Sequence, residues 1–138
     1  MVCSLFNEEK KAWEYQEDNI GKTIYSKNDK SKLKVDYLGL LKEEHTLLVP
    51  KEFDKWDEET KSWIENSVEK EKNRIVNIKE EAGKIILERY PLFKQTNAQL
   101  LIYGQEYLDD MIAFITDIKS QSDDLELDAT KTKDDFVI

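Results

Sequence analysis

The spacing of apolar residues divides the chain into a region of short strands, a region of helices and a polar end. In the first region, short runs with β-branched and aromatic side chains are separated by turn-forming residues. In one run, Leu33, Val35 and Tyr37 alternate with charged residues, which predicts a strand with one buried face. We therefore expect a small antiparallel β unit over residues 1–63.

Two eight-residue phrases in this unit resemble each other. Residues 6–13 read FNEEKKAW and residues 56–63 read WDEETKSW, with an aromatic residue at each end and Asn or Asp in second place. An Asn or Asp side chain there can start a tight turn, which predicts a hairpin pinned by its aromatic residues. A helix that begins at Asp57 as its N-cap is the alternative. We favour the hairpin for both copies, with the aromatics anchoring the unit; a surface that grips a partner strand or a sugar is the second interpretation.

The next region has helical spacing. Over residues 64–90, apolar side chains recur on one face, and Val68, Ile75 and Ala82 lie seven positions apart. Charged residues occupy the opposite face. This pattern predicts one long amphipathic helix.

A proline then interrupts the pattern. Pro91 disfavours helical geometry at Tyr90, so we expect a break at Tyr90–Pro91 and a second long helix over residues 92–119. The two helices, within residues 64–120, form either a hairpin or a coiled coil. Each has a face narrow enough for a coiled-coil seam, so homo-oligomers through the helices are expected.

Residues 121–138 complete an expected α+β fold: a small β unit with aromatic hairpins, two long helices and a tail. This last segment is acidic and lacks apolar periodicity until Phe136–Ile138. Such a composition is typical of a disordered segment. We expect a disordered acidic tail whose three apolar residues are untethered; the alternative is that Phe136–Ile138 docks elsewhere on the protein.

Composition restricts the partners. The 138 residues suffice for one ordinary domain and include 30 acidic and 21 basic residues, for a net charge of −9. This balance argues against nucleic acid and against anionic lipid surfaces as partners, because both bind clustered Lys and Arg. No apolar run reaches the roughly 18 residues of a membrane span, so we expect no membrane partner. The single Cys3 and a start without signal-peptide features favour a reducing cytoplasm.

The sequence lacks a recognisable catalytic constellation. It has no metal-binding, phosphate-binding or nucleophile motif, and its only histidine, His45, has no partner of the right kind nearby in sequence. The acid pairs Asp109–Asp110 and Asp123–Asp124 lack the spacing of a calcium loop. We therefore expect no enzymatic activity, no catalytic residue, no cofactor and no metal.

The order of motifs over residues 38–120 resembles that of bacteriophage tail-fibre assembly proteins. In that family a TLL-P segment leads to a W-D-x-x-T-x-x-W phrase. A charged helix follows and ends in Tyr-Pro, and a Lys-Gln pair and an Asn come next. The matching residues here are Thr46, Leu47, Leu48, Pro50, Trp56, Asp57, Thr60, Trp63, Tyr90, Pro91, Lys94, Gln95 and Asn97.

The resemblance implies a non-enzymatic tail-fibre assembly chaperone or accessory protein. Its partner would be a phage tail-fibre protein, which it would help to fold or oligomerise in the host cytoplasm or accompany into the virion tail. The expected partner-binding residues are Trp56, Trp63, Tyr90, Pro91, Phe93, Lys94, Gln95 and Asn97. The segment around Pro91 is either a kinked helix junction or a contact surface. We favour the junction, with Tyr90 and Phe93 in the core and with Gln95 and Asn97 bonding free backbone groups at the helix break.

Two other functions fit a small acidic protein of this kind. One is a structural component of the virion tail that oligomerises through its helices. The other is an acidic phage-encoded inhibitor that mimics nucleic acid and blocks a host defence protein. Lysines interleaved with the acidic residues weaken the second of these, because a mimic requires long arrays of carboxylates.

Overall fold

The computed structural model describes residues 2–138 and has an α+β fold, as the sequence predicted. Within this range, small antiparallel strand pairs form the first part and three α-helices the second. The chain divides into two compact units between Ser67 and Val68. We call them the strand unit and the helical unit, and describe each by itself.

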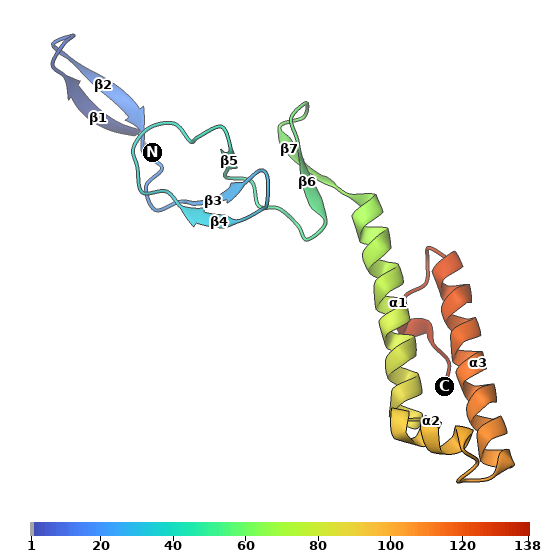
Figure 1. The fold of residues 1–138 in the computed structure, drawn as a ribbon. Helices are drawn as coiled ribbons and strands as arrows, with labels where there is room; N and C mark the ends of the chain where they lie inside the picture. Colours follow the sequence, from blue (N-terminus) through green and yellow to red (C-terminus); the bar gives the residue numbers. More distant parts are fainter. Residues whose placement is uncertain (1) are drawn as a thin grey trace. The chain divides into compact units, whose positions relative to one another are not determined.

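Both aromatic phrases form β-hairpins, which confirms the interpretation favoured from the sequence (Figure 1). The strands are β1 (Val2–Asn7), β2 (Ala12–Glu17), β6 (Asp54–Asp57) and β7 (Ser62–Glu65). The aromatic rings of Phe6 and Trp13 face each other edge to face across the first hairpin, with centroids 5.5 Å apart. Trp56 and Trp63 repeat this arrangement in the second at 5.3 Å.

The two hairpin loops share one geometry. The Asn7 side chain accepts hydrogen bonds from the N–H groups of Glu9 and Lys10, each at 3.1 Å. Asp57 accepts from the hydroxyl and the N–H of Thr60, and these bonds lower the pKa of its carboxyl. At the end of each loop a lysine has left-handed backbone geometry. The repeated phrase is therefore a repeated turn closed by an aromatic pair.

A three-stranded sheet lies between the hairpins in sequence, in the order β4-β3-β5. Its strands are β3 (Thr23–Ser26), β4 (Lys32–Lys34) and β5 (His45–Thr46). Ile24 and Val35 are its buried apolar residues. The alternation of Leu33, Val35 and Tyr37 predicted a longer strand with all three side chains on one buried face. Val35 is buried, but it follows the end of β4 at Lys34, and Leu33 is exposed. The chain leaves the strand after Lys34, so period-two geometry does not continue to Tyr37.

The helical unit contains α1 (Ser67–Arg89), α2 (Leu92–Gln99) and α3 (Gln105–Leu127). The first helix ends immediately before Tyr90–Pro91, where the sequence predicted a break. The prediction of one second helix over residues 92–119 is wrong. Residues 100–104 interrupt it, because Leu101 and Gly104 take left-handed backbone angles that no helix can contain.

Helices α1 and α3 run side by side in opposite directions, with α2 across one end (Figure 1). Ala82 and Ile85 of α1 pack on Ile118 of α3 in the middle of the pair. Tyr90, Ala98 and Met111 form a second buried cluster at the α2 end. The helices thus pair within one chain as a hairpin, and association of copies through them stays a prediction.

The acidic segment 121–138 is ordered, which corrects the prediction of a disordered tail. Helix α3 continues to Leu127, and a short 3-10 helix, η1 (Lys133–Asp135), follows. The physical reason is burial: Ser122 and Leu125 lie in the helical interface, and Phe136 packs against the cluster of Ala82, Ile85 and Ile118. Leu125 and Phe136 are therefore the apolar residues of this segment that the fold covers.

Candidate functional site

Six of the eight expected partner-binding residues lie at the α1–α2 junction of the helical unit. They are Tyr90, Pro91, Phe93, Lys94, Gln95 and Asn97. The other two, Trp56 and Trp63, belong to the strand unit, so the two groups are considered separately.

Tyr90 is part of the core and presents little surface to a partner. Its side chain is buried between Tyr107, edge to face at 5.8 Å, and Phe114 at 5.6 Å. The guanidinium of Arg89 lies 4.6 Å from the centre of the Phe114 ring. Tyr90 therefore holds the junction together.

Polar side chains complete the helix break. Gln95 donates a hydrogen bond from Nε2 to the carbonyl oxygen of Tyr90 at 2.7 Å, as expected for a group left free at the end of α1. Asn97 bonds a side chain instead: its Nδ2 donates to the hydroxyl of Tyr103 at 2.9 Å. Pro91 accepts from the N–H groups of Lys94 and Gln95 and so starts α2. These residues fix the path of the chain across the end of the helical pair.

The same contacts leave apolar side chains exposed around α2. Phe93 is 61% exposed, and a run of consecutive apolar residues after α2 is also exposed. We call this set the apolar end surface; it consists of Leu92, Phe93, Leu100, Leu101, Ile102 and Tyr103. A run of three or more exposed apolar residues is unusual in a folded protein unless it binds something.

Leu101 occupies a position at which glycine is usual. The N–H of Ile102 bonds the carbonyl of Asn97 at 3.0 Å, and the N–H of Leu101 bonds that of Ala98 at 2.9 Å. This pair of bonds is the Schellman motif, which needs a left-handed residue after the helix. Leu101 has φ of 58°, a conformation that costs a residue with a side chain about 1–2 kcal/mol. The leucine is therefore unfavourable for the turn itself, which points to a role for its exposed side chain.

In the strand unit, Trp56 and Trp63 are held by the unit itself. Trp63 donates from Nε1 to the carbonyl of Leu48 at 2.8 Å, and Trp56 donates to the Glu58 carboxylate at 2.9 Å. The ammonium of Lys27 lies 4.7 Å from the centre of the Trp56 ring and covers it. This geometry supports an anchoring role for both tryptophans.

A shallow cavity of about 270 Å³ lies beside Trp56. It is lined by Lys27, Asn28, Glu43, Glu44, Trp56 and Glu58. Lys61 hydrogen-bonds the Glu58 carboxylate and lowers its pKa, so this group stays ionised at neutral pH. The cavity is open, and Lys27 already occupies the aromatic face of Trp56 that a ligand would use.

The first hairpin has the more exposed aromatic pair. Trp13 is 67% exposed and Phe6 is also exposed, whereas both tryptophans of the second hairpin are half-buried. The sequence could not distinguish the copies, because burial depends on residues outside the phrase. Leu48 and Lys27 cover the second hairpin.

A third copy of the hairpin loop was missed in the sequence. It joins β3 to β4: the Ser26 hydroxyl accepts from the N–H of Asn28 at 3.3 Å, and Lys30 has φ of 62°. In all three loops a small polar residue is followed, four positions later, by a left-handed lysine (Lys11, Lys30 and Lys61). This spacing was the signal in the sequence that all three loops share. The third copy is harder to find because Lys32 stands where the other two copies have the closing tryptophan.

The sequence patterns identified only part of the apolar end surface. Phe93 was among the expected contacts, but Leu92 and residues 100–103 were assigned to the interior of a helix. Four consecutive apolar residues directly before Gly104 were the available signal, since a glycine there marks a chain turn.

Within residues 2–138, no cluster of three or more His, Cys, Asp or Glu side chains is arranged to hold a metal ion. No helix in this range is both long enough and apolar enough to cross a membrane. No protein-family model matches the chain, and no significant match was found among curated proteins or solved structures.

Proposed function

We propose that this chain is a non-enzymatic assembly protein that binds a phage tail-fibre subunit and aids its folding or oligomerisation. The observation that carries the proposal is the apolar end surface, with Leu101 in a conformation that favours glycine. The tail-fibre partner is proposed from the resemblance in motif order over residues 38–120.

The apolar end surface fits a partner that exposes apolar groups before assembly. Its side chains come from a short helix and a hydrogen-bonded turn, so they are held in place before binding. Such preorganisation lowers the entropy cost of association. An unassembled fibre subunit has apolar surface that its neighbours later cover, and the end surface would shield it until then.

Leucine 101 offers a test that separates function from stability. The substitution Leu101→Gly removes the exposed side chain and relieves the left-handed backbone, so the helical unit should become more stable by about 1 kcal/mol. Val76 on α1 is a matched control, because it is 49% exposed while Leu101 is 50% exposed. Val76→Ala removes exposed apolar side-chain atoms from α1, at a position outside the end surface.

The experiment is co-expression with the tail-fibre subunit encoded by the same genome, with assembled fibre measured by size exclusion and light scattering. The wild-type chain and Val76→Ala should raise the yield of assembled fibre at least about fivefold. Leu101→Gly should lose most of this increase although it is the more stable protein. Equal yields with Leu101→Gly and Val76→Ala would refute binding through the end surface.

The same experiment separates a chaperone from a virion component. A chaperone acts below one copy per fibre subunit and is missing from the purified fibre. A structural component stays in it at fixed stoichiometry.

A further inference from the structure

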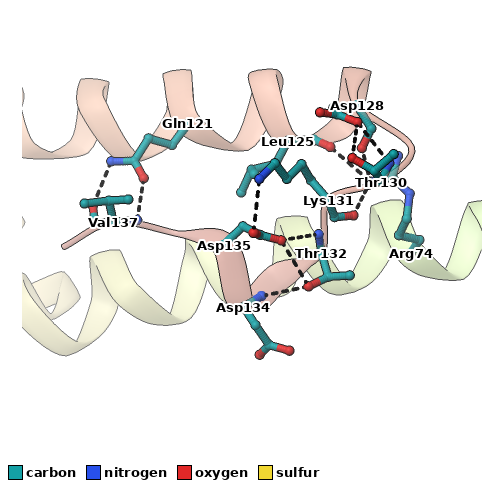
Figure 2. Close-up of polar contacts among 10 residues, drawn as sticks. All are labelled: Arg74, Gln121, Leu125, Asp128, Thr130, Lys131, Thr132, Asp134, Asp135 and Val137. Carbon is teal, nitrogen blue, oxygen red and sulfur yellow. Dashed lines mark hydrogen bonds and ion pairs between the residues drawn. The ribbon is translucent and has the colours of Figure 1, made fainter.

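The tail follows a defined path back along the helical pair. Beyond Leu127, the Asp128 carboxylate accepts hydrogen bonds from the N–H and the hydroxyl of Thr130, at 3.0 and 2.7 Å. The N–H of Lys131 bonds the carbonyl of Asp128 at 3.0 Å. This turn sends the tail between α1 and α3, as Figure 2 shows.

A capping box then gives the tail a local structure of its own. The N–H of Thr132 donates to the Asp135 carboxylate at 2.8 Å, and the N–H of Asp134 donates to the Thr132 hydroxyl at 3.3 Å. The bond from the Thr132 N–H is the largest cause that lowers the pKa of the Asp135 carboxyl, and the ammonium of Lys131 lowers it further. The tail therefore has local structure that does not depend on its contacts with the helices.

Helix α1 recognises the main chain of the tail through Arg74. Its guanidinium donates to the carbonyl oxygens of Asp128 at 3.2 Å and Lys131 at 2.9 Å, and it also bonds the last carbonyls of α3. The Glu71 carboxylate holds the other side of the guanidinium. These contacts are made to backbone atoms, so they do not depend on the side chains of the tail.

Helix α3 recognises the main chain through Gln121. Its Oε1 accepts from the N–H of Val137 at 2.8 Å, while its Nε2 donates to the carbonyl of Val137 at 2.9 Å (Figure 2). A neighbouring β-strand would offer the same donor and acceptor pair. Asp117 accepts a further bond from Nε2 and orients the amide.

One side chain of the tail reaches the core. Phe136 packs against the buried cluster of the helical pair, whereas the side chains of Val137 and Ile138 are exposed. We call the helical residues that hold the segment the tail seat; they are Arg74, Ala82, Ile85, Ile118 and Gln121. The tail seat thus combines main-chain recognition with an apolar contact for one half-buried aromatic residue, and extended peptides are commonly bound through such a combination.

We propose that the tail seat is a peptide-binding site and that it accepts the tail of a second copy of this chain by reciprocal exchange. Each copy brings one seat and one tail that fits it, so exchange remakes the contacts of Phe136 and Val137 with the seat between two chains. Phe136 of the partner copy then completes the core of the first. This interface goes beyond the proposed function and does not use the apolar end surface.

The segment 128–131 is the hinge. All of its residues are exposed. When the segment is extended, it spans about 14 Å and carries the tail away from its own seat. While the Asp128 turn is formed, the tail has a high effective concentration at its own seat and binds there. When this turn opens, the tail loses its high effective concentration at its own seat, and binding to the seat of a second copy is favoured.

Thr130→Pro tests the exchange in the full chain. Proline removes the N–H that bonds Asp128 and disfavours the turn conformation at Ala129, so the hinge becomes extended. Thr130→Ala is the matched control, because it keeps the N–H that bonds Asp128 and loses the hydroxyl and the methyl group of the side chain. Mass is measured by light scattering between about 5 and 500 μM, and helix content by circular dichroism.

We expect the association constant for dimerisation to be at least tenfold higher for Thr130→Pro than for Thr130→Ala, with unchanged helix content. Adding Phe136→Ala to Thr130→Pro should restore the control value, since the exchanged contact is then lost. The proposal is overturned if Thr130→Pro matches Thr130→Ala at every concentration, or if the double variant still dimerises. Neither result affects the proposed function, whose test uses Leu101.

A second measurement addresses the seat directly, with a fluorescent peptide of residues 128–138 as the probe. Full-length Phe136→Ala, whose own tail is loosened, should bind this peptide at least tenfold more tightly than Val137→Ala, whose tail stays seated. A peptide carrying the Phe136→Ala change should bind neither. If Phe136→Ala has too little helix for the assay, Asp135→Ala is the acceptor, because it breaks the capping box and the ion pair with Lys131 and leaves Phe136 in place. If a folded acceptor binds the wild-type peptide and the Phe136→Ala peptide equally tightly, the tail seat is not a peptide-binding site.

Discussion

At the scale of single residues, four positions other than glycine have left-handed backbone geometry: Lys11, Lys30, Lys61 and Leu101. The three lysines end hairpin loops, where the side chains of Lys11 and Lys61 are exposed and that of Lys30 donates a hydrogen bond to the carbonyl of Glu52. The leucine ends a helix, where its side chain joins the apolar end surface. Local geometry is the same in both cases, but only the leucine adds exposed apolar area to the unfavourable conformation.

The lysine positions allow a test of this cost. Lys11→Gly should stabilise the β1–β2 hairpin by about 0.5–1 kcal/mol, because glycine takes the left-handed conformation without steric strain but loses more entropy on folding. Amide hydrogen exchange of the paired β1 and β2 backbone should slow by about two- to fivefold. Lys11→Ala keeps the strain and should leave exchange unchanged; slower exchange in this variant would show that the lysine side chain, and not the backbone, sets the stability.

At the scale of elements, the helical pair depends on a narrow line of small and branched side chains. Ile118 is completely buried between α1 and α3, and the tail adds Phe136 to the same cluster. The pair thus has a third layer supplied by the tail. Gln121 and Arg74 bind this layer through its backbone, so its position does not rest on apolar contact alone.

The packing at Ile118 gives a second prediction. Ile118→Val removes one buried methylene and should lower the free energy of unfolding by about 1 kcal/mol, since the close-packed site cannot fill the space. Urea unfolding followed by helical circular dichroism measures this change. The same substitution at Ile112, which is 51% exposed, should change stability by less than about 0.5 kcal/mol. Equal effects at the two sites would contradict the packing described.

At the scale of the whole molecule, the buried clusters formed by several apolar residues all lie in the helical unit. The strand unit relies instead on turn hydrogen bonds, aromatic pairs and a few buried residues such as Ile24 and Val35. The two units therefore differ in the forces that hold them. We expect each to unfold in its own transition.

A fragment tests this independence. Residues 67–138 alone should keep the helical circular dichroism of the unit, with a midpoint of thermal unfolding within about 3 °C of the helical transition in the full chain. The reason is that the clusters around Ile118 and Met111 take all their residues from this segment. An unfolded fragment would show that the strand unit contributes to the helical core.

The sequence by itself determined the features that depend on neighbours along the chain. Turn chemistry and flanking aromatics specify the hairpins at Asn7 and Asp57, and helical periodicity with Pro91 specifies α1 and its end. These signals are local, because the groups that interact lie within a few residues of one another. For the same reason, the α+β class could be read from the pattern alone.

Only the tertiary structure decided the seat of the tail and the exposure of the end surface. Arg74 and Lys131 are 57 positions apart, and no periodicity relates them. The apolar run 100–103 looks like helix interior until the left-handed turn at Leu101 places it outside. Burial depends on which distant segments cover a side chain, so the two surfaces with proposed roles appear only when the chain is folded.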